Sequence, residues 1–277
     1  MSEGMKYSVL MSVYHREKPT NLIESLDSIF NQTIEPDEVI LVKDGVLTKE
    51  LEEIIDSYLN KYNDFHVYAL EKNCGLGVAL NFGLTHCGNE IIVRMDTDDI
   101  SVQNRVEKQL EYLKGNENVS VLGSYVEEFL DGDHRSLYVK QCPMEDYKIK
   151  EMFKKKNAMN HPSVVFKKSA VESINGYIEL KFNEDYFLWV RMAEKGFNFA
   201  NIDEPLVRMR INNDTYLRRG GLKYFRTQNT IYKYMRERKY INFKEYIFGY
   251  MVRIVFRVLL TNKLRKLAYT SLLRRAI

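Results

Sequence analysis

Strand patterns and helix patterns alternate through the first 115 residues, and this alternation limits the possible folds more than any other feature. Apolar runs at residues 7–13, 39–42, 65–70 and 90–95 have the length of strands buried on both faces. Apolar residues at helical spacing lie between them, and Thr20 is placed to cap the first helix. Strand and helix at this spacing predict an α/β fold with a mostly parallel sheet and right-handed crossovers.

The second half of the chain has a less regular pattern. It predicts a strand at residues 119–129, a lysine-rich helix at 147–156 and a short strand at 163–166. Helices at 170–174 and 185–195 would end at Gly176 and Gly196. From Tyr224 onward the pattern indicates mostly basic helices. The 277 residues suit one large α/β domain followed by a helical tail.

The N-terminus shows no signal-peptide pattern, and the cysteines show no metal or redox pattern. Residues 1–7 lack the basic and apolar regions of a signal peptide. No run of 18 uninterrupted apolar residues occurs, so we expect no membrane-spanning helix. Cys74, Cys87 and Cys142 are far apart and form neither a metal-like nor a redox-like pair. This usage fits a reducing cytosol.

Charge is distributed unevenly along the chain. Residues 215–277 carry 16 Lys or Arg and two acidic residues, whereas residues 1–214 carry 25 basic and 36 acidic ones. An acidic body with a basic tail predicts a negatively charged partner at the C-terminal end. The absence of a nucleic-acid-binding motif makes nucleic acid a minor option.

Polar residues follow the predicted parallel strands at residues 14–17, Asp44, Asn73 and 96–99. In an open parallel sheet, ligands bind beyond the carboxyl ends of the strands. The sharpest pattern is Arg94-Met95-Asp96-Thr97-Asp98-Asp99, because three carboxylates within four residues repel one another unless a cation balances them. Hard oxygen ligands suit Mg²⁺ or Mn²⁺, which also bind diphosphates. The alternative is a solvated loop in which Asp99 caps the next helix.

Several other residues have a chemical and a structural interpretation. Asp44 precedes Gly45, so it can bind a base or ribose or form a structural turn, the commoner case. Glu184 and Asp185 precede an apolar helical stretch that contains Trp189. Asp185 can be a helix cap or a general base. His161 is more often a hydrogen-bonded structural residue than a ligand.

Other cofactor motifs are absent from the sequence. Gly75-Leu76-Gly77 resembles the start of a dinucleotide fingerprint, but Leu80 stands where the third glycine belongs. The chain has neither a phosphate-binding loop ending in Gly-Lys-Ser/Thr nor a His-Glu-x-x-His zinc motif. These absences argue against nicotinamide, P-loop and zinc-protease chemistry.

Taken in order, the segments resemble family 2 of the glycosyltransferases, which has the GT-A fold. The match covers roughly residues 6 to 212. Its parts are the first strand (residues 8–14), a "S-L-x-S-I-x-x-Q-T" stretch (25–33), a "V-D-D-G" turn (42–45), a "N-x-G-x-x-x-A-x-N-x-G" segment (73–83), a "D-x-D-D" motif (96–99) and an "E-D-Y-x-L-W" motif (184–189). Each motif alone is weak, and their common order makes the resemblance specific.

The resemblance implies roles for individual residues. Residues 1–214 would form the catalytic domain, with a nucleotide-sugar half at 1–115 and an acceptor half at 116–214, followed by the basic segment 215–277. Asp98 and Asp96 would hold Mn²⁺ or Mg²⁺, and Asp185 would be the catalytic base of an inverting displacement. The remaining implied contacts to a UDP-sugar donor are Ser12, Val13, Tyr14, Glu17, Asp44, Asn73, Gly75, Asn81 and Arg94. Asp99, Glu184, His161 and Trp189 are further candidates.

This sequence departs from the family pattern at two positions. Lys43 stands where the first acid of the "D-D-G" turn is found, which alters the expected base or ribose contacts. Asn212 stands at the histidine of a "Y-R-x-H" pattern, so a metal ligand of relatives would be weakened or replaced.

The overall pattern is similar to bacterial enzymes that extend lipid-linked O-antigen or capsule repeat units. It implies a hexose donor, with galactose or glucose favoured, and a polyprenyl-diphosphate-linked saccharide acceptor. The tail then reads as basic helices lying on an anionic membrane surface, at the inner face of the cytoplasmic membrane. The equally weighted alternative is a basic helical cap on the acidic domain.

Two other functions compete with the glycosyltransferase interpretation. A nucleotidyltransferase shares the general fold and the need for a metal, but the chain lacks a glycine-rich loop after its first strand. A catalytically inactive scaffold for polysaccharide assembly would have lost its carboxylates, yet Asp44, Asp96, Asp98 and Asp185 are all present.

Overall fold

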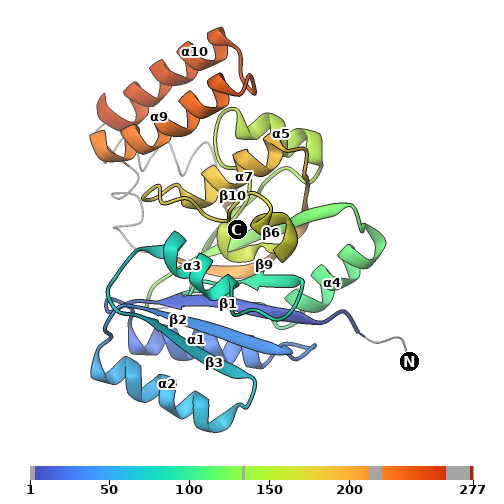
Figure 1. Cartoon of the computed structure of the whole chain (residues 1–277), viewed down its shortest axis with the longest axis vertical. Coiled ribbons are helices and arrows are strands. Elements are labelled where there is room, and N and C mark those ends of the chain that lie inside the picture. Colours follow the sequence, from blue (N-terminus) through green and yellow to red (C-terminus); the bar gives the residue numbers. More distant parts are fainter. Residues whose placement is uncertain (1–3, 133–134, 212–219, 260–274, 277) are drawn as a thin grey trace.

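A mixed sheet with helices on both faces forms the body of the protein (Figure 1). The computed structural model describes residues 4–132, 135–211, 220–259 and, for the backbone alone, 275–276. Within that part of the chain the strand order is β10-β7-β6-β8-β4-β1-β2-β3, and β9 pairs with β5 and β6. The predicted α/β class with flanking helices is confirmed.

The parallel part of the sheet comes from the first half of the chain. It contains β1 (Tyr7–Val13), β2 (Glu38–Asp44), β3 (Phe65–Leu70) and β4 (Ile91–Arg94). All neighbouring pairs among these strands are parallel. Helices α1 (Pro19–Phe30), α2 (Lys49–Lys61) and α3 (Leu76–Leu84) make the crossovers. The carboxyl ends of β1, β2 and β4 therefore meet at one edge of the sheet.

Beyond β4 the sheet is mixed. Strand β8 (Val165–Lys167) runs antiparallel to β4 and to β6 (Val119–Leu130), while β9 (Asn198–Ile211) runs parallel to β6. Strand β7 (Ser136–Lys140) pairs antiparallel with β6 and with β10 (Arg275–Ala276), and β5 (Ile100–Ser101) pairs with β9. Strands β7 and β9 have no clear signal in the sequence, because β7 is half-exposed throughout and charged residues interrupt the apolar pattern of β9.

Two apolar cores lie on opposite faces of the sheet. Helices α1, α2 and α4 (Arg105–Gly115) bury their apolar faces in one core. Helices α3, α5 (Asp146–Phe153), α6 (Lys168–Glu172) and α7 (Glu184–Glu194) pack into the other. Helix α3 lies very close to the strands, since a Cβ atom at Gly83 would be 2.5 Å from Leu10 Cδ1 and 2.8 Å from Val42 Cγ2. Only a residue without a side chain allows this approach.

Two predicted helix caps are wrong. Helix α1 begins at Pro19 after Lys18 rather than at a Thr20 cap, because proline is favoured in the first turn, where its missing N–H costs nothing. Helix α7 begins after Asn183, so Asp185 lies inside its first turn and is not the cap. The closing glycines were placed correctly, since Gly176 and Gly196 both follow their helices with positive φ values.

The C-terminal helices α9 (Gly221–Glu237) and α10 (Phe243–Arg253) stack at one end of the molecule, opposite α1 and α2 (Figure 1). Helix α9 buries Ile231, Tyr232 and Met235 in the core that contains α7. Helix α10 is mostly exposed and buries only Arg253. Among the described residues, no helix has the length and apolar character needed to cross a membrane. The predicted boundary between residues 214 and 215 lies outside the described residues.

Candidate active site

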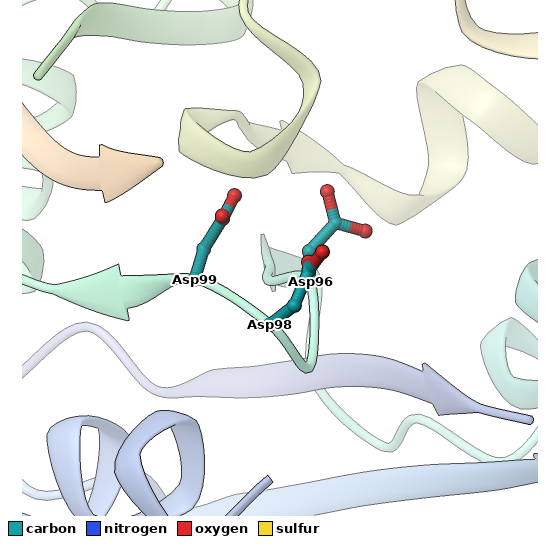
Figure 2. A group of neighbouring side chains, drawn as sticks. All are labelled: Asp96, Asp98 and Asp99. Atoms are coloured by element: carbon teal, nitrogen blue, oxygen red, sulfur yellow. The ribbon is translucent and has the colours of Figure 1, made fainter. Parts of the chain in front are cut away.

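The aspartates of the 96–99 loop lie together directly after β4 (Figure 2). One carboxylate oxygen each from Asp96, Asp98 and Asp99 lies within 4.8 Å of the others. The loop is held to the sheet because Met95 N donates a 3.1 Å hydrogen bond to Leu10 O on β1. Local sequence thus places three hard oxygen ligands at the carboxyl edge, as predicted for a cation site.

Crowding of these carboxylates changes their acidity. Burial, and then the charges of Asp96 and Glu17, raise the pKa of Asp98 to about 7. Burial, and then the charge of Asp98, raise the pKa of Asp99 well above its usual value. A divalent cation would relieve this repulsion, so the donor set fits Mg²⁺ or Mn²⁺.

Arg94, the last residue of β4, lies buried beneath this loop with 1% of its surface exposed. Its Nη2 donates a hydrogen bond to Asp96 Oδ1. Its Nε and Nη1 are also buried and have no hydrogen-bond partner among the described residues. Although burial opposes it, the Asp96 carboxylate raises the pKa of Arg94, so the guanidinium stays charged.

Two further arginines hold the aspartate loop, and sequence analysis assigned neither a role. Arg210 on β9 donates from its main-chain N to Asp99 Oδ1 at 2.8 Å and from Nε to Asp98 O at 2.9 Å. Arg105 is fully buried, and its Nη2 donates to Arg94 O at 2.8 Å. No local signal marks either residue, because α4 contains several charged residues and β9 contains Arg208 two positions before Arg210. Asp99 therefore caps no helix and instead accepts a hydrogen bond from β9.

The segment after β1 contacts the same loop. Thr97 Oγ1 lies 2.9 Å from Glu17 Oε2 and 3.3 Å from Ser12 O, so it ties both residues to the aspartates. Tyr14 is exposed, and its ring lies edge-to-face with that of His15, their centroids 5.7 Å apart. The Val13 side chain belongs to the core under α1, which leaves only its main chain for a ligand.

Four of the predicted donor-contacting residues, Asp44, Asn73, Gly75 and Asn81, have hydrogen-bond partners at or near one turn or on Tyr177. Asp44 accepts hydrogen bonds from Cys74 N at 2.7 Å, and from Gly75 N and Asn73 Nδ2 at 3.0 Å each. Both its carboxylate oxygens therefore shape the turn in which Gly75 has a φ of 94°. Asn81 exchanges two 2.7 Å hydrogen bonds with the main chain of Tyr177.

Lys43, the first departure from the family pattern, pairs with Glu52 on α2 at 2.9 Å. The charge that replaces the expected acid is therefore held by the following helix. Asn212, the second departure, lies outside the described residues.

A second acidic group, the pair Glu184 and Asp185, begins α7. Burial, and then the charge of Asp185, raise the pKa of Glu184 to about 7, and Glu184 Oε2 has no partner among the described residues. Burial also raises the pKa of Asp185. Its Oδ2 accepts a 2.7 Å hydrogen bond from Asn157 Nδ2. The charge of Arg94 acts on both of these acids and on Asp98, so one buried guanidinium influences both acidic groups.

His161 and Trp189 lie in the core rather than at the surface. His161 Nε2 is 2.9 Å from Tyr177 Oη, and burial together with the charge of Arg94 holds the pKa of His161 well below its usual value. The imidazole is therefore neutral. Trp189 is fully buried with its ring edge-on to His161, their centroids 6.1 Å apart.

Comparison with known proteins agrees with this geometry. The model of Glycosyl transferase family 2 matches residues 8–174. A UDP-Gal:alpha-D-GlcNAc-diphosphoundecaprenol beta-1,3-galactosyltransferase from Escherichia coli is 38% identical over 270 residues, covering 98% of this chain and 97% of that protein. The amylovoran biosynthesis glycosyltransferase AmsE from Erwinia amylovora is 34% identical over 253 residues, covering 91% and 94%.

The fold has a counterpart among solved structures. S. aureus TarS 1–349 in complex with UDP-GlcNAc superposes with a TM-score of 0.69 and 17% identity, covering 96% of this chain and 75% of that one. The chain belongs to glycosyl transferase family 2 and has the GT-A fold.

Proposed function

We propose that the protein is an inverting glycosyltransferase that moves a hexose from a UDP-sugar to a lipid-linked saccharide in the synthesis of a bacterial surface polysaccharide. Galactose or glucose is the favoured sugar. The observation that carries the proposal is that the charge of Arg94 acts on two acidic groups. One is the Asp96–Asp98–Asp99 cluster, which suits a cation, and the other is the Glu184–Asp185 pair. A transferase needs both, one group for the leaving diphosphate and the other for the attacking hydroxyl.

Asp96 and Asp98 would hold Mn²⁺ or Mg²⁺. When bound, such an ion neutralises charge that develops on the leaving diphosphate. The Nε and Nη1 atoms of Arg94 are buried beneath the loop and have no hydrogen-bond partner in the described part of the chain, so the guanidinium would supply positive charge to the same place. Arg105 and Arg210 keep the loop in position.

Asp185 would accept the proton of the acceptor hydroxyl as that oxygen attacks the anomeric carbon. Attack on the face opposite the leaving diphosphate inverts the configuration of that carbon. A raised pKa makes Asp185 a stronger base than an exposed aspartate, while Arg94 and Asn157 favour its charged form.

The donor nucleotide would lie at the carboxyl ends of β1 and β2. Ser12, Tyr14 and Glu17 border the aspartate loop there, and the exposed ring of Tyr14 can stack on a base. Asp44 and Asn73 would support nucleotide binding by fixing the turn beside it, since their side chains are hydrogen-bonded to each other and Asp44 also accepts a main-chain N–H of that turn.

The acceptor assignment is supported by the name of the Escherichia coli relative, which specifies a GlcNAc-diphosphoundecaprenol acceptor. Such a lipid is presented at a membrane. The segment from α10 to residue 259 carries an exposed apolar stripe that includes Phe248, Met251 and Leu259 at 73%, 56% and 68% exposure. With the excess of basic residues beyond 215, this stripe suits an anionic membrane surface at the inner face of the cytoplasmic membrane.

A donor panel combined with one substitution tests the proposal. The protein is incubated with Mn²⁺ and each of UDP-galactose, UDP-glucose, UDP-GlcNAc, UDP-GalNAc and GDP-mannose, and stabilisation is measured by thermal shift. Transfer is measured to a synthetic GlcNAc-diphosphate-lipid. We expect one UDP-sugar to stabilise the protein and Asp185→Asn to bind it normally without transfer. Stabilisation by GDP-mannose alone, or full transfer by Asp185→Asn, would contradict the proposal.

A further inference from the structure

The segment that follows α5 lies between the C-terminal helices and Asp185. Three tyrosine hydroxyls donate hydrogen bonds to carbonyl oxygens of α5 and of this segment: Tyr240 to Lys150 at 3.0 Å and Tyr186 to Phe153, both on α5, and Tyr232 to Lys155 at 2.6 Å, after the helix. Two of these tyrosines come from the C-terminal region, and Tyr186 is the neighbour of Asp185 on α7. These bonds hold the second half of α5 and Lys155, two residues before Asn157.

Asn157 is itself held in one orientation. Its Oδ1 accepts a 3.1 Å hydrogen bond from Met159 N, and its Nδ2 donates to Asp185 Oδ2 at 2.7 Å. Because an N–H can bond only to the oxygen of the amide, the Met159 contact fixes which end faces Asp185. The carboxylate therefore has one oxygen bound by a fixed donor.

Tyr232 connects the C-terminal helices to this arrangement. It is 2% exposed and belongs to the core shared by α9 and α7. The Arg253 guanidinium of α10 lies over its ring, 3.1 Å from the ring centroid. Gly249 permits this packing, since a Cβ there would be 2.8 Å from Tyr232 Cε1. Helix α10 thus fixes the tyrosine whose hydroxyl holds Lys155.

We propose that Asn157 is a positioning residue for the catalytic base Asp185, and that the α9–α10 pair supports it through the Tyr232 hydroxyl. This inference rests on the proposed role of Asp185. It gives the C-terminal helices a part in the reaction that is separate from any contact with a membrane.

The electrostatic surroundings of Asp185 define how the amide acts. Glu184 lies beside it on α7, Tyr177 precedes that helix, and the charges of Arg94 on β4 and Lys140 on β7 also act on it. Burial raises the pKa of Asp185, whereas the main-chain N–H of Tyr186, the charges of Arg94 and Lys140 and the Asn157 hydrogen bond lower it. Removing the amide donor therefore raises the pKa of the base, and activity at acid pH is lost first.

Asn157→Asp tests this with the least change in shape. An aspartate can still accept the Met159 N–H, so the fold is retained, but it replaces the donor with a negative charge. We expect kcat to fall by about 10- to 100-fold with little change in donor KM, and the acid limb of the kcat profile to move to higher pH. Asn157→Ala should act in the same direction with a smaller pH shift. Asn116→Ala, at the end of α4, is the matched control.

Tyr232→Phe tests the second part of the inference. It removes the hydroxyl while keeping the ring under Arg253, and Tyr58→Phe on α2 is its control. We expect Tyr232→Phe to lower kcat. In the double variant with Asn157→Ala the two decreases should not add, because both act through the hydrogen bond from Asn157 to Asp185. Additive effects would overturn the link to α9. Rates are measured with UDP-galactose and the GlcNAc-diphosphate-lipid, and binding of that donor by thermal shift.

The outcomes separate this inference from the proposed function. An inactive Asp185→Asn together with a normal Asn157→Asp would overturn the positioning role and leave the base assignment intact. A lower kcat for Asn157→Asp with an unmoved acid limb would indicate a purely structural role and would also overturn it. An active Asp185→Asn would contradict both the base assignment of Asp185 and the positioning role of Asn157.

Discussion

The main-chain N–H of Arg210 donates a 2.8 Å hydrogen bond to a carboxylate oxygen of Asp99, joining two residues 111 positions apart. The Arg210 side chain is 6% exposed and also pairs with Glu24 on α1 and with Asp131. One residue of β9 thus connects the aspartate loop, helix α1 and the end of β6. The shape of the Asp96–Asp98–Asp99 cluster therefore depends on contacts from the second half of the chain.

Arg210→Ala should destabilise the protein and loosen the aspartate loop. Glu24 and Asp131 would lose a buried partner, for which we expect a decrease of roughly 2 to 4 kcal/mol in the free energy of unfolding. Arg208→Ala is the control, because this neighbour on β9 is 30% exposed and pairs with Glu127. It should cost below about 1 kcal/mol. Urea unfolding of both variants measures the difference, and equal losses would argue against a special role for Arg210.

Asp98→Asn should have opposite effects with and without a cation. Because the folded pKa of Asp98, about 7, is above its unfolded value, the metal-free protein loses stability as the pH rises between those two values, so the neutral amide should be the more stable form by pH 7 and above. The same change removes a cation ligand, so Mn²⁺ with UDP should no longer raise the Tm. Asp203→Asn, an exposed change on β9, should leave both readouts as in the wild type. A normal Mn²⁺ response in Asp98→Asn would refute the metal role.

Glu184→Gln should become more stabilising as the pH rises. The folded pKa of Glu184, about 7, is above its unfolded value, so the folded protein binds more protons between those values and loses stability as the pH increases. A glutamine at position 184 does not titrate, so the stability of the variant lacks this dependence on pH. The stability difference should be near zero at acid pH and grow by at most about 1.4 kcal/mol per pH unit up to about pH 7. Chemical denaturation across this range checks it, and a constant difference would show that Glu184 is not the titrating group.

Gly83→Ala should destabilise the fold by about 1 to 3 kcal/mol, because the new methyl group meets the side chains of Leu10 and Val42. Gly115, at the end of α4, has nothing within 4 Å of its virtual Cβ, so Gly115→Ala should be neutral or slightly stabilising. Thermal unfolding of the two variants is the measurement. A neutral Gly83→Ala would mean that α3 moves away from the sheet easily.

A triple substitution of Phe248, Met251 and Leu259 to Ser should weaken binding to anionic vesicles by about tenfold or more, since these exposed side chains would enter the lipid interface. Leu222→Ser, at a residue of α9 with 57% exposure, is the control. Vesicle sedimentation with phosphatidylglycerol, compared with phosphatidylcholine, measures the effect. Unchanged binding would leave the stripe without a membrane role.

The sequence alone determined the features that depend on neighbouring residues. Strand β1 and strand β3 were placed at their observed ends, because continuous apolar runs between polar turns are local signals. Local order also placed the three aspartates directly after a buried strand, and parallel pairing then puts them at the ligand-binding edge. The acidic pair Glu184–Asp185 was found in the same way.

Only the tertiary structure decided which of these polar groups are free. Asp44 and Asn81 read as ligand contacts, yet their hydrogen bonds go to segments 30 and 96 residues away. Arg105, Arg210 and Asn157 acquire their roles from contacts that cross the sheet or join separate helices. The physical reason is that a polar side chain commits its hydrogen bonds to whatever partner the folded chain brings to it, and residue spacing in the sequence does not contain that distance.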